Sequence, residues 1–248
     1  MTSILPILLA TFLISLISFL GVLFLFLNEK KLEKILLFLV SFSAGALLGG
    51  AFLHLLPEAI LESEASFEPF LYLLLGFCAF FVLEQFVHWH NCSVDGCVKT
   101  PKPFSYLILV GDAVHNFIDG VIIAGSFAVS PSFGLVTVVA VILHEIPQEI
   151  GDFGVLVYSG FKKATALWLN FVSGLTAILG GIVGFFILQK IEGIIFFLLA
   201  FAAGGFIYIA SSDLIPEIKH QESKAKSVAH FFVFLAGLSL MAILKFVE

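Results

Sequence analysis

The feature that most constrains this chain is a succession of eight apolar runs, each about 20 to 25 residues long. Only 12% of the residues are charged, whereas a soluble domain has about 25%. None of the runs alternates with period two, as the strands of a membrane barrel do. Inside hydrocarbon the backbone must satisfy its own hydrogen bonds, so runs of this kind form helices. We therefore predict an all-α integral membrane protein built as an eight-helix transmembrane bundle.

Hydropathy also gives approximate boundaries for these spans. At roughly 30 residues for one span and its loop, the length leaves no room for a sizeable soluble domain, so we expect residues 1–248 to form a single polytopic transmembrane domain. The predicted spans are 3–27, 35–60, 69–90, 104–129, 133–158, 164–189, 193–215 and 228–247.

The distribution of lysines predicts the orientation. All 12 basic residues are lysines, and all but Lys190 and Lys245 fall in alternate loops. By the positive-inside rule those loops face the cytoplasm, which puts both termini outside the cytoplasm. We expect a cell membrane, plasma or inner, as the location and the lipid bilayer as a partner. We expect no nucleic acid partner, because no basic patch is present.

An internal repeat links the second and seventh spans. When residues 42–58 are laid on residues 201–217 without gaps, seven of 17 positions are identical, Pro57 with Pro216 among them. Because the second span runs outward and the seventh inward, the repeat is inverted, as in many secondary transporters. We predict that spans one to three and six to eight form pseudo-symmetric halves around spans four and five.

Nine carboxyl groups lie inside or at the ends of predicted spans, where an ionised group costs several kcal/mol. No lysine lies among them, so we predict that a mobile cation, rather than a lysine, balances their charge. Carboxyls at the span ends, Glu58 and Glu217, are interpreted as meeting water. The nine are Glu58, Glu84, Asp112, Asp119, Glu145, Glu149, Asp152, Asp213 and Glu217.

Span four carries the first half of a candidate metal site. Asp112, His115, Asn116 and Asp119 follow the spacing i, i+3, i+4, i+7, which lines one face of a helix with carboxylate, imidazole and amide groups. Such a face near the middle of a membrane helix needs polar partners on a neighbouring helix.

Span five carries the second half. His144 with Gln148 and Glu145 with Glu149 form two i, i+4 pairs, and Asp152 follows. Together the two helices offer four to six nitrogen and oxygen donors for one or two cations, a set suited to Zn²⁺, Fe²⁺ or Mn²⁺. The alternative is a hydrogen-bond network that only packs the helices together.

The segments HNFIDG and HEIPQEIGDF resemble the paired signatures of the ZIP family of zinc and iron transporters. The resemblance covers essentially the whole chain and implies uptake of divalent cations toward the cytoplasm through a binuclear site. Zinc is the foremost substrate, with Fe²⁺, Mn²⁺ and Cd²⁺ as alternatives. The implied ligands of the first ion are His115, Asp119, His144 and Gln148, and those of the second are Asn116, Asp119 and Glu145, with Asp119 bridging.

The chain departs from this family at two places. Many relatives have a histidine where this chain has Gln148, and an amide is the weaker ligand for zinc. Some bacterial relatives have a glutamate in span six, where this chain offers Asn170, Ser173 and Thr176. The metal preference and the occupancy of the second position therefore stay open.

Further carboxyls and histidines predict a pathway. We expect metal to enter past His54 and Glu58 and to leave by Asp213 and Glu217, with Asp112 and Asp152 also on the pathway. The segment 88–97 carries histidines and cysteines at a spacing that matches no closed zinc site, and we interpret it as a polar loop at the membrane interface.

A rival hypothesis is an intramembrane zinc-dependent hydrolase. The sequence His144-Glu145 followed by Gln148 lacks the second histidine of the H-E-x-x-H motif. An inverted repeat has a use in alternating access and none in hydrolysis, so we expect a transporter and no enzyme. Association into homodimers is left open.

Overall fold

The computed structural model describes residues 3–26, 29–64, 66–95, 101–102, 104–186, 194–219 and 224–245, with the backbone alone at 29–31, 33–34, 87–95, 129 and 133. All regular elements in these ranges are helices. They are α1 (Ile4–Ile17), η1 (Ser18–Gly21), α2 (Val22–Leu25), α3 (Glu29–Gly49), η2 (Gly50–Leu55), α4 (Leu56–Glu62), α5 (Glu68–Asp95), α6 (Phe104–Val129), α7 (Pro131–Ser159), α8 (Lys163–Gly174), α9 (Thr176–Phe186), α10 (Ile194–Tyr208), η4 (Ile209–Leu214), α11 (Ile215–Lys219) and α12 (Lys224–Lys245).

Eight helical stretches within the described ranges are long and apolar enough to cross a bilayer, which confirms the predicted all-α, eight-span fold. The shortest has 19 residues, about 29 Å at 1.5 Å per residue, which matches the hydrocarbon core of about 30 Å. The spans are Ile4–Leu25, Ile35–Glu62, Glu68–Phe86, Phe104–Ala128, Gly134–Ser159, Lys163–Phe186, Ile194–Lys219 and Lys224–Lys245.

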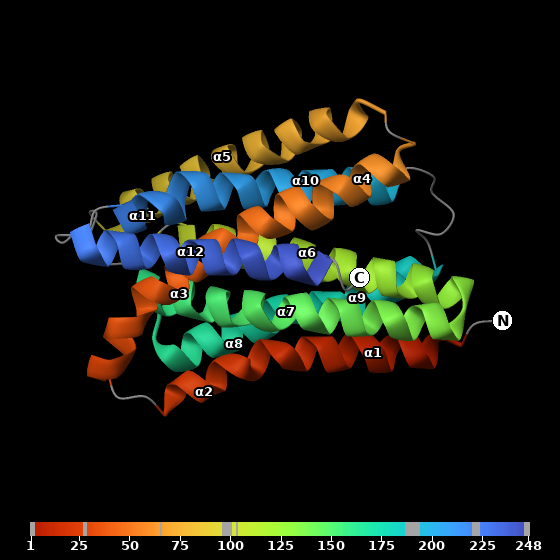
Figure 1. Cartoon of the computed structure of the whole chain (residues 1–248), viewed down its shortest axis with the longest axis horizontal. Coiled ribbons are helices and arrows are strands. Elements are labelled where there is room, and N and C mark those ends of the chain that lie inside the picture. Colours follow the sequence, from red (N-terminus) through yellow and green to blue (C-terminus); the bar gives the residue numbers. More distant parts are fainter. Residues whose placement is uncertain are drawn as a thin grey trace.

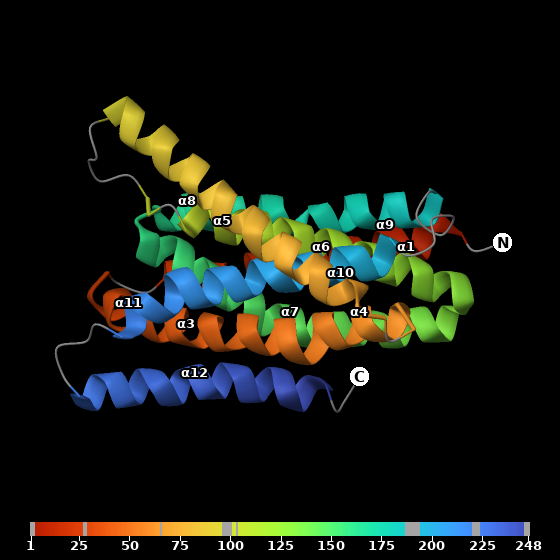
Figure 2. The same ribbon diagram turned by 90° about the horizontal axis from the view of Figure 1, so that it is seen from above.

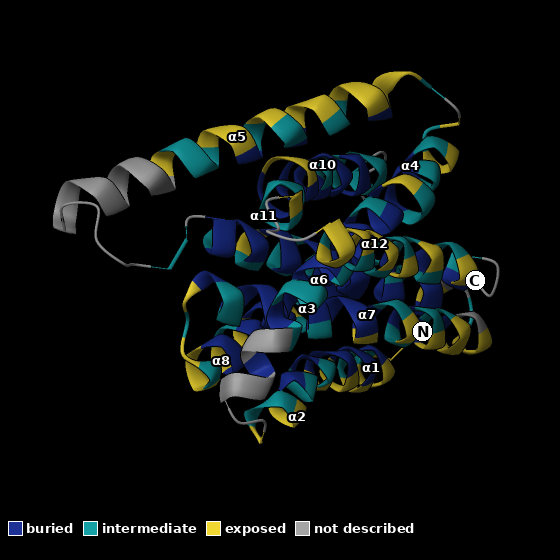
Figure 3. Cartoon of the chain, turned by 60° about the vertical axis from the view of Figure 1, so that its left-hand side comes forward, coloured by how far each residue is buried: buried dark blue, intermediate teal, exposed yellow. Residues whose placement is uncertain are grey.

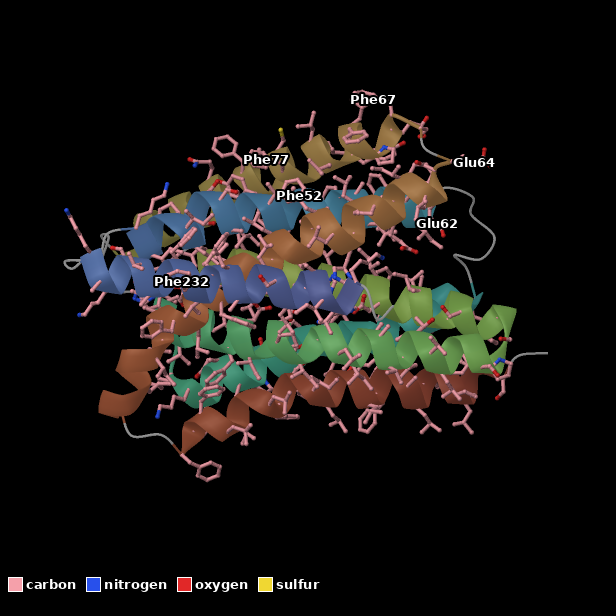
Figure 4. All side chains as sticks on the ribbon, in the orientation of Figure 1. Phe52, Glu62, Glu64, Phe67, Phe77 and Phe232 are labelled. Atoms are coloured by element: carbon pink, nitrogen blue, oxygen red, sulfur yellow. The ribbon has the colours of Figure 1, made fainter. Side chains whose placement is uncertain are left out.

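The fourth span, α6, is the most buried of the eight described spans, and α7 packs along it with Leu135, Val136 and Val139 exposed on its outer face. The first and sixth spans cover one side of this pair, and α3, α10, α12 and α5 lie on the other (Figure 1). Figure 2 places α12 at one edge and α5 across the bundle, and Figure 3 shows that α5 is among the most exposed of the helices. Phe67 and Phe232 point outward in Figure 4, as expected of side chains that face lipid.

The third span differs from its prediction at one end. The backbone of α5 continues as a helix to Asp95, so residues 88–95 do not form the predicted loop. Their side chains and residues 96–100, which complete the predicted interfacial loop, lie outside the described part of the chain.

Both repeat segments contain a π-helical turn at the same position. Element η2 spans Gly50–Leu55 and element η4 spans Ile209–Leu214, ranges that the alignment of 42–58 with 201–217 lays exactly on each other. Each turn ends two residues before a proline, whose ring would clash with the carbonyl four residues earlier in a regular helix. A wider turn moves that carbonyl away, and π turns occur frequently at functional sites.

The two repeat segments also pack in a similar manner, each close against one neighbouring helix. Helix α3 packs along α12, where a Cβ on Gly45 would clash with the backbone of Phe234. Helix α10 packs along α5, where a Cβ on Gly204 would clash with the backbone of Leu73. The two segments run in opposite directions along the bundle (Figure 1). Span two thus packs on span eight and span seven on span three, and the inverted repeat of the two halves stays a prediction.

We predict that the repeat glycines are required for this close packing. Gly45→Ala and Gly204→Ala should each lower the free energy of unfolding by about 1 to 3 kcal/mol, because the added methyl group meets a helix backbone that side-chain rotation cannot move aside. Thermal unfolding of the purified protein in detergent micelles measures the effect.

Gly125→Ala provides the matched control, since no atom lies within 4 Å of its added Cβ and alanine favours a helix. Equal losses of stability in all three variants would contradict the packing argument.

Candidate metal centre

A tight connection sets the register of α6 and α7. Only Ser130 separates the end of α6 from the start of α7. His115 lies 15 residues before Ser130 and His144 lies 14 residues after it, so each is about 21 to 23 Å along its helix from the turn. The two polar faces therefore meet at one depth in the bundle, as the sequence predicts.

Four side chains converge where these faces meet: His115, Asp119, His144 and Glu145. The Nε2 atom of His115 lies 3.3 Å from Oε1 of Glu145 and 3.7 Å from Oδ2 of Asp119. The Nε2 atom of His144 lies 3.3 Å from the same Asp119 oxygen and 4.0 Å from the same Glu145 oxygen. One atom from each side chain thus contributes to a single compact cluster.

Burial makes this cluster unusual. Glu145 is fully buried, and within the described residues neither of its carboxylate oxygens has a hydrogen-bond partner. His115 is 4% exposed, and neither of its ring nitrogens makes a hydrogen bond to the described residues. Buried polar atoms almost always have hydrogen-bond partners. A group of buried donors and acceptors without such partners therefore indicates a binding site for a ligand.

The separations suit a divalent cation. Ligand atoms about 2.0 to 2.1 Å from a tetrahedral zinc ion lie about 3.3 to 3.4 Å from one another. Two of the four separations between ligand atoms are 3.3 Å. The other two, 3.7 and 4.0 Å, need to shorten by less than 1 Å to match this geometry. Two imidazoles with two carboxylates form a set that suits Zn²⁺ and also accepts Fe²⁺ or Mn²⁺.

A second group of carboxyls lies next to the first. Oxygens of Asp112, Glu145 and Glu149 lie within 4.8 Å of one another, so Glu145 belongs to both groups. The amide of Asn116 donates to Oδ1 of Asp112 at 2.9 Å and orients it, while Oδ2 of Asp112 has no hydrogen-bond partner within the described ranges. The second group offers only oxygen ligands, which favour harder cations than imidazole does.

Glu149 is held from two other helices. One of its oxygens accepts a hydrogen bond from Ser18 of η1, and the other accepts one from the amide of Asn170 on α8. All three side chains are buried. These contacts turn Glu149 away from the histidine cluster, so the structure does not bring it together with His115 and His144.

The remaining predicted residues of span five follow the same face. Gln148 is 5% exposed and lines the cavity described next. Asp152 is 2% exposed and lies further along α7, where Oγ of Ser43 on α3 is 3.5 Å from its Oδ1. The helix continues without interruption through Pro147.

A cavity of about 440 Å³ connects the histidine cluster with one end of the bundle. His115, Asp119, His144 and Gln148 line its inner part, and His54, Glu58, Glu62 and Lys245 are among the residues nearer its mouth. Figure 4 shows Glu62 at that end, in the last turn of α4. The imidazole of His54 donates from Nε2 to the carbonyl of Met241 at 2.8 Å, and its ring centroid lies 6.1 Å from that of His144. His54 and Glu58 therefore lie where an entrance would need them.

Asp213 and Glu217 lie toward the opposite end of the bundle and line no part of this cavity. Nζ of Lys102 lies 2.6 Å from Oε1 of Glu217, and Nζ of Lys245 lies 3.9 Å from Oε2 of Glu58. The prediction that these carboxyls have no lysine partner is therefore wrong for both span ends. The flexible lysine stem lets the ammonium group reach a carboxylate from the neighbouring helix end.

Sequence reasoning missed the groups that hold these carboxyls. Ser18 and Asn170 hold Glu149, and Lys102 and the hydroxyl of Tyr158 hold Glu217. These contacts join distant spans, and helical spacing gives no signal for them. Asn170 offered the one available hint, since a buried amide in a membrane helix needs a partner.

Comparison with known proteins gives a consistent result. A family model described as ZIP Zinc transporter matches residues 4–95 and 93–245. Zinc transporter ZIP13 of Pongo abelii is 33% identical over 221 residues, which cover 83% of this chain and 65% of that protein. Zinc transporter ZIP13 of Mus musculus is 30% identical over 253 residues, covering 85% and 70%. Zinc transporter SLC39A7 of Mus musculus is 30% identical over 309 residues, covering 89% and 65%. The matches thus span about two thirds of the length of these relatives.

We predict that Asn170 and Glu149 are energetically coupled. Asn170→Ala should lower the free energy of unfolding by about 1 to 3 kcal/mol, because it leaves a buried carboxyl oxygen of Glu149 without a donor. In the background Glu149→Ala the same change should cost clearly less. A double-mutant cycle by chemical unfolding in detergent gives the coupling.

Ser63→Ala serves as the control, because its hydroxyl bonds only to Ile60 of its own helix, and its effect should add to that of Glu149→Ala. Additive effects of Asn170→Ala and Glu149→Ala would show that their contact contributes nothing.

Proposed function

Because the chain belongs to the ZIP zinc transporter family, we propose that it carries divalent metal cations, zinc foremost, across a membrane into the cytoplasm. The observation that carries the proposal is the convergence of His115, Asp119, His144 and Glu145 in the middle of the bundle, at the inner end of a cavity. Family members are transporters, which decides against the intramembrane hydrolase. The eight spans make the chain a multi-pass membrane protein.

The first ion binds among His115, Asp119, His144 and Glu145. Each of these side chains has one ligand atom in the cluster, and the orphaned oxygens of Glu145 support a cation rather than packing as the reason for the cluster. Gln148 borders the cluster and provides a further oxygen. Zn²⁺ is the expected substrate, and Fe²⁺, Mn²⁺ and Cd²⁺ are further candidates.

The second ion binds between α6 and α7 on the far side of Glu145 from the histidines. Asp112 and Glu149 provide its other carboxylates, and Asn116 and Asn170 orient them. Glu145 is common to both groups and is therefore a candidate bridge, in addition to Asp119, which the family resemblance implies. The all-oxygen surroundings suit release of a zinc ion, because carboxylates without imidazole hold zinc less selectively.

The direction of transport follows from the lysine distribution. The cavity opens at the end of the bundle where α1 begins and α12 ends (Figure 1). By the positive-inside rule that end lies outside the cytoplasm. Metal then enters past Glu58 and His54 and exchanges its bound water for the ligands of the histidine cluster. It next passes Asp112, Glu149 and Asp152 and leaves by Asp213 and Glu217.

We predict that Glu145→Gln lowers zinc uptake into proteoliposomes by at least about 100-fold, since the change removes a carboxylate from both cation positions. Uptake of Zn²⁺, Fe²⁺, Mn²⁺ and Cd²⁺ is measured with purified protein. Glu68→Gln makes the same chemical change on an exposed turn of α5 and should keep wild-type uptake. If the Glu145→Gln variant took up zinc as well as the Glu68→Gln variant does, the assignment of the metal site would be wrong.

We predict that Gln148 sets the metal preference. Gln148→His should raise the ratio of zinc to manganese uptake by about tenfold, because imidazole binds zinc more selectively than an amide does. Competition between the two ions in the same proteoliposomes gives the ratio directly. An unchanged ratio would show that Gln148 does not contact the ion.

A further inference from the structure

Glu217 has both carboxylate oxygens occupied. Nζ of Lys102 donates to Oε1 at 2.6 Å, and the hydroxyl of Tyr158 donates to Oε2 at 2.7 Å. The same ammonium group lies 4.6 Å from the centre of the Tyr158 ring, within the range of a cation–π interaction. Three groups from three parts of the chain therefore form one closed network at the end of the bundle opposite the cavity.

Lys102 and Tyr158 belong to one unit that carries the metal centre. The backbone N–H of Lys102 donates to the carbonyl of Ser159 at 3.0 Å, and the carbonyl of Lys102 accepts bonds from the N–H and the hydroxyl of Ser105. The start of α6 and the end of α7 are thus tied together. Glu217 comes from α11, at the end of a repeat segment. The network consequently joins the metal-binding pair to a helix of the surrounding halves.

The repeat provides an internal comparison. Glu58 occupies the position of Glu217 in the first segment, also directly after a proline. Its lysine contact is longer, 3.9 Å from Nζ of Lys245, and its side chain is 46% exposed against 26% for Glu217. The looser pair lies at the mouth of the open cavity. The tighter pair lies toward the opposite end of the bundle, and neither Lys102 nor Glu217 lines this cavity.

We propose that Lys102 and Tyr158 are positioning residues that latch Glu217 and hold the inner end of the pathway closed while the outer end is open. This inference rests on the proposed transport function. Release of metal to the cytoplasm requires the α6–α7 pair to separate from α11, which breaks both bonds to Glu217. Glu217 then becomes available to the departing cation, and a lysine no longer competes for it. Rebinding of Lys102 returns the empty protein to the state described here.

A cysteine reporter tests the latch without measuring transport. In a background of Cys78→Ser, Cys92→Ser and Cys97→Ser, Ser43→Cys places a thiol at a 2% exposed position against Asp152, between α3 and α7. The rate of labelling by a charged thiol reagent in detergent then reports opening of the inner end. Thr11→Cys, at a fully buried position on α1, reports general loosening of the fold.

Lys102→Gln should raise the labelling rate of Ser43→Cys by roughly fivefold or more, and Tyr158→Phe should raise it less, because removal of latch contacts shifts the population toward the open form. Lys162→Gln makes the same change at an exposed lysine of the same end and should leave the rate unchanged. Lys102→Glu combined with Glu217→Lys should return the rate toward the parent value, since the exchanged pair can re-form.

Equal labelling rates in Lys102→Gln and Lys162→Gln would overturn the latch, as would a parallel rise at Thr11→Cys. Zinc uptake by the wild-type protein is measured separately in proteoliposomes. Its absence would remove the transport proposal, whereas normal uptake with unchanged labelling would remove the latch alone.

Discussion

The structure depends on burying the polar faces of α6 and α7 against each other. Ionised or strongly polar side chains cost several kcal/mol in hydrocarbon, and this pair of helices carries most of those in the bundle interior. The short turn at Ser130 brings both faces to one depth. Helix α9 approaches α6 closely at Gly120, where a Cβ would clash with the backbone of Ala177. Neighbouring helices therefore approach closely, and Glu145 is fully buried with its Oε1 3.3 Å from Nε2 of His115.

Hydropathy and helical spacing predicted the polar faces of α6 and α7, because both patterns involve residues that are close together in the sequence. Hydropathy gave the eight spans, and helical spacing placed His115 and Asp119 on one face. The position of both polar faces near midspan predicted that these two residues meet His144 and Glu145. The two hydrogen bonds that hold the Glu149 carboxylate were not predicted. Their donors, Ser18 and Asn170, come from spans one and six, and no periodicity relates these spans to span five. Glu149, which helical spacing pairs with Glu145, lies in one group with Glu145 and Asp112.

The repeat illustrates the same limit at a larger scale. Seven identities in 17 residues predicted that two spans share a design, and the paired π turns and exchanged helix contacts agree with it. The alignment could not predict that residues at matching positions have different surroundings. His54 and Asp213 occupy matching positions of the two π turns, yet only His54 borders the cavity. The two turns lie toward opposite ends of the bundle, so a cavity that opens at one end reaches only one of them.

The placement of lysines explains why the ends and the middle of this pathway differ. A lysine at the depth of Glu145 would be a permanent cation, and a tethered ammonium group would compete with every arriving metal ion for the same carboxylates. At the helix ends the lysine stem extends toward water, so the ammonium group can leave a carboxylate at small cost. Lys245 and Lys102 therefore cover Glu58 and Glu217 reversibly, whereas the central carboxyls have no lysine partner within the described residues. We propose that a mobile divalent cation, or protons in its absence, balances the charge of the central group.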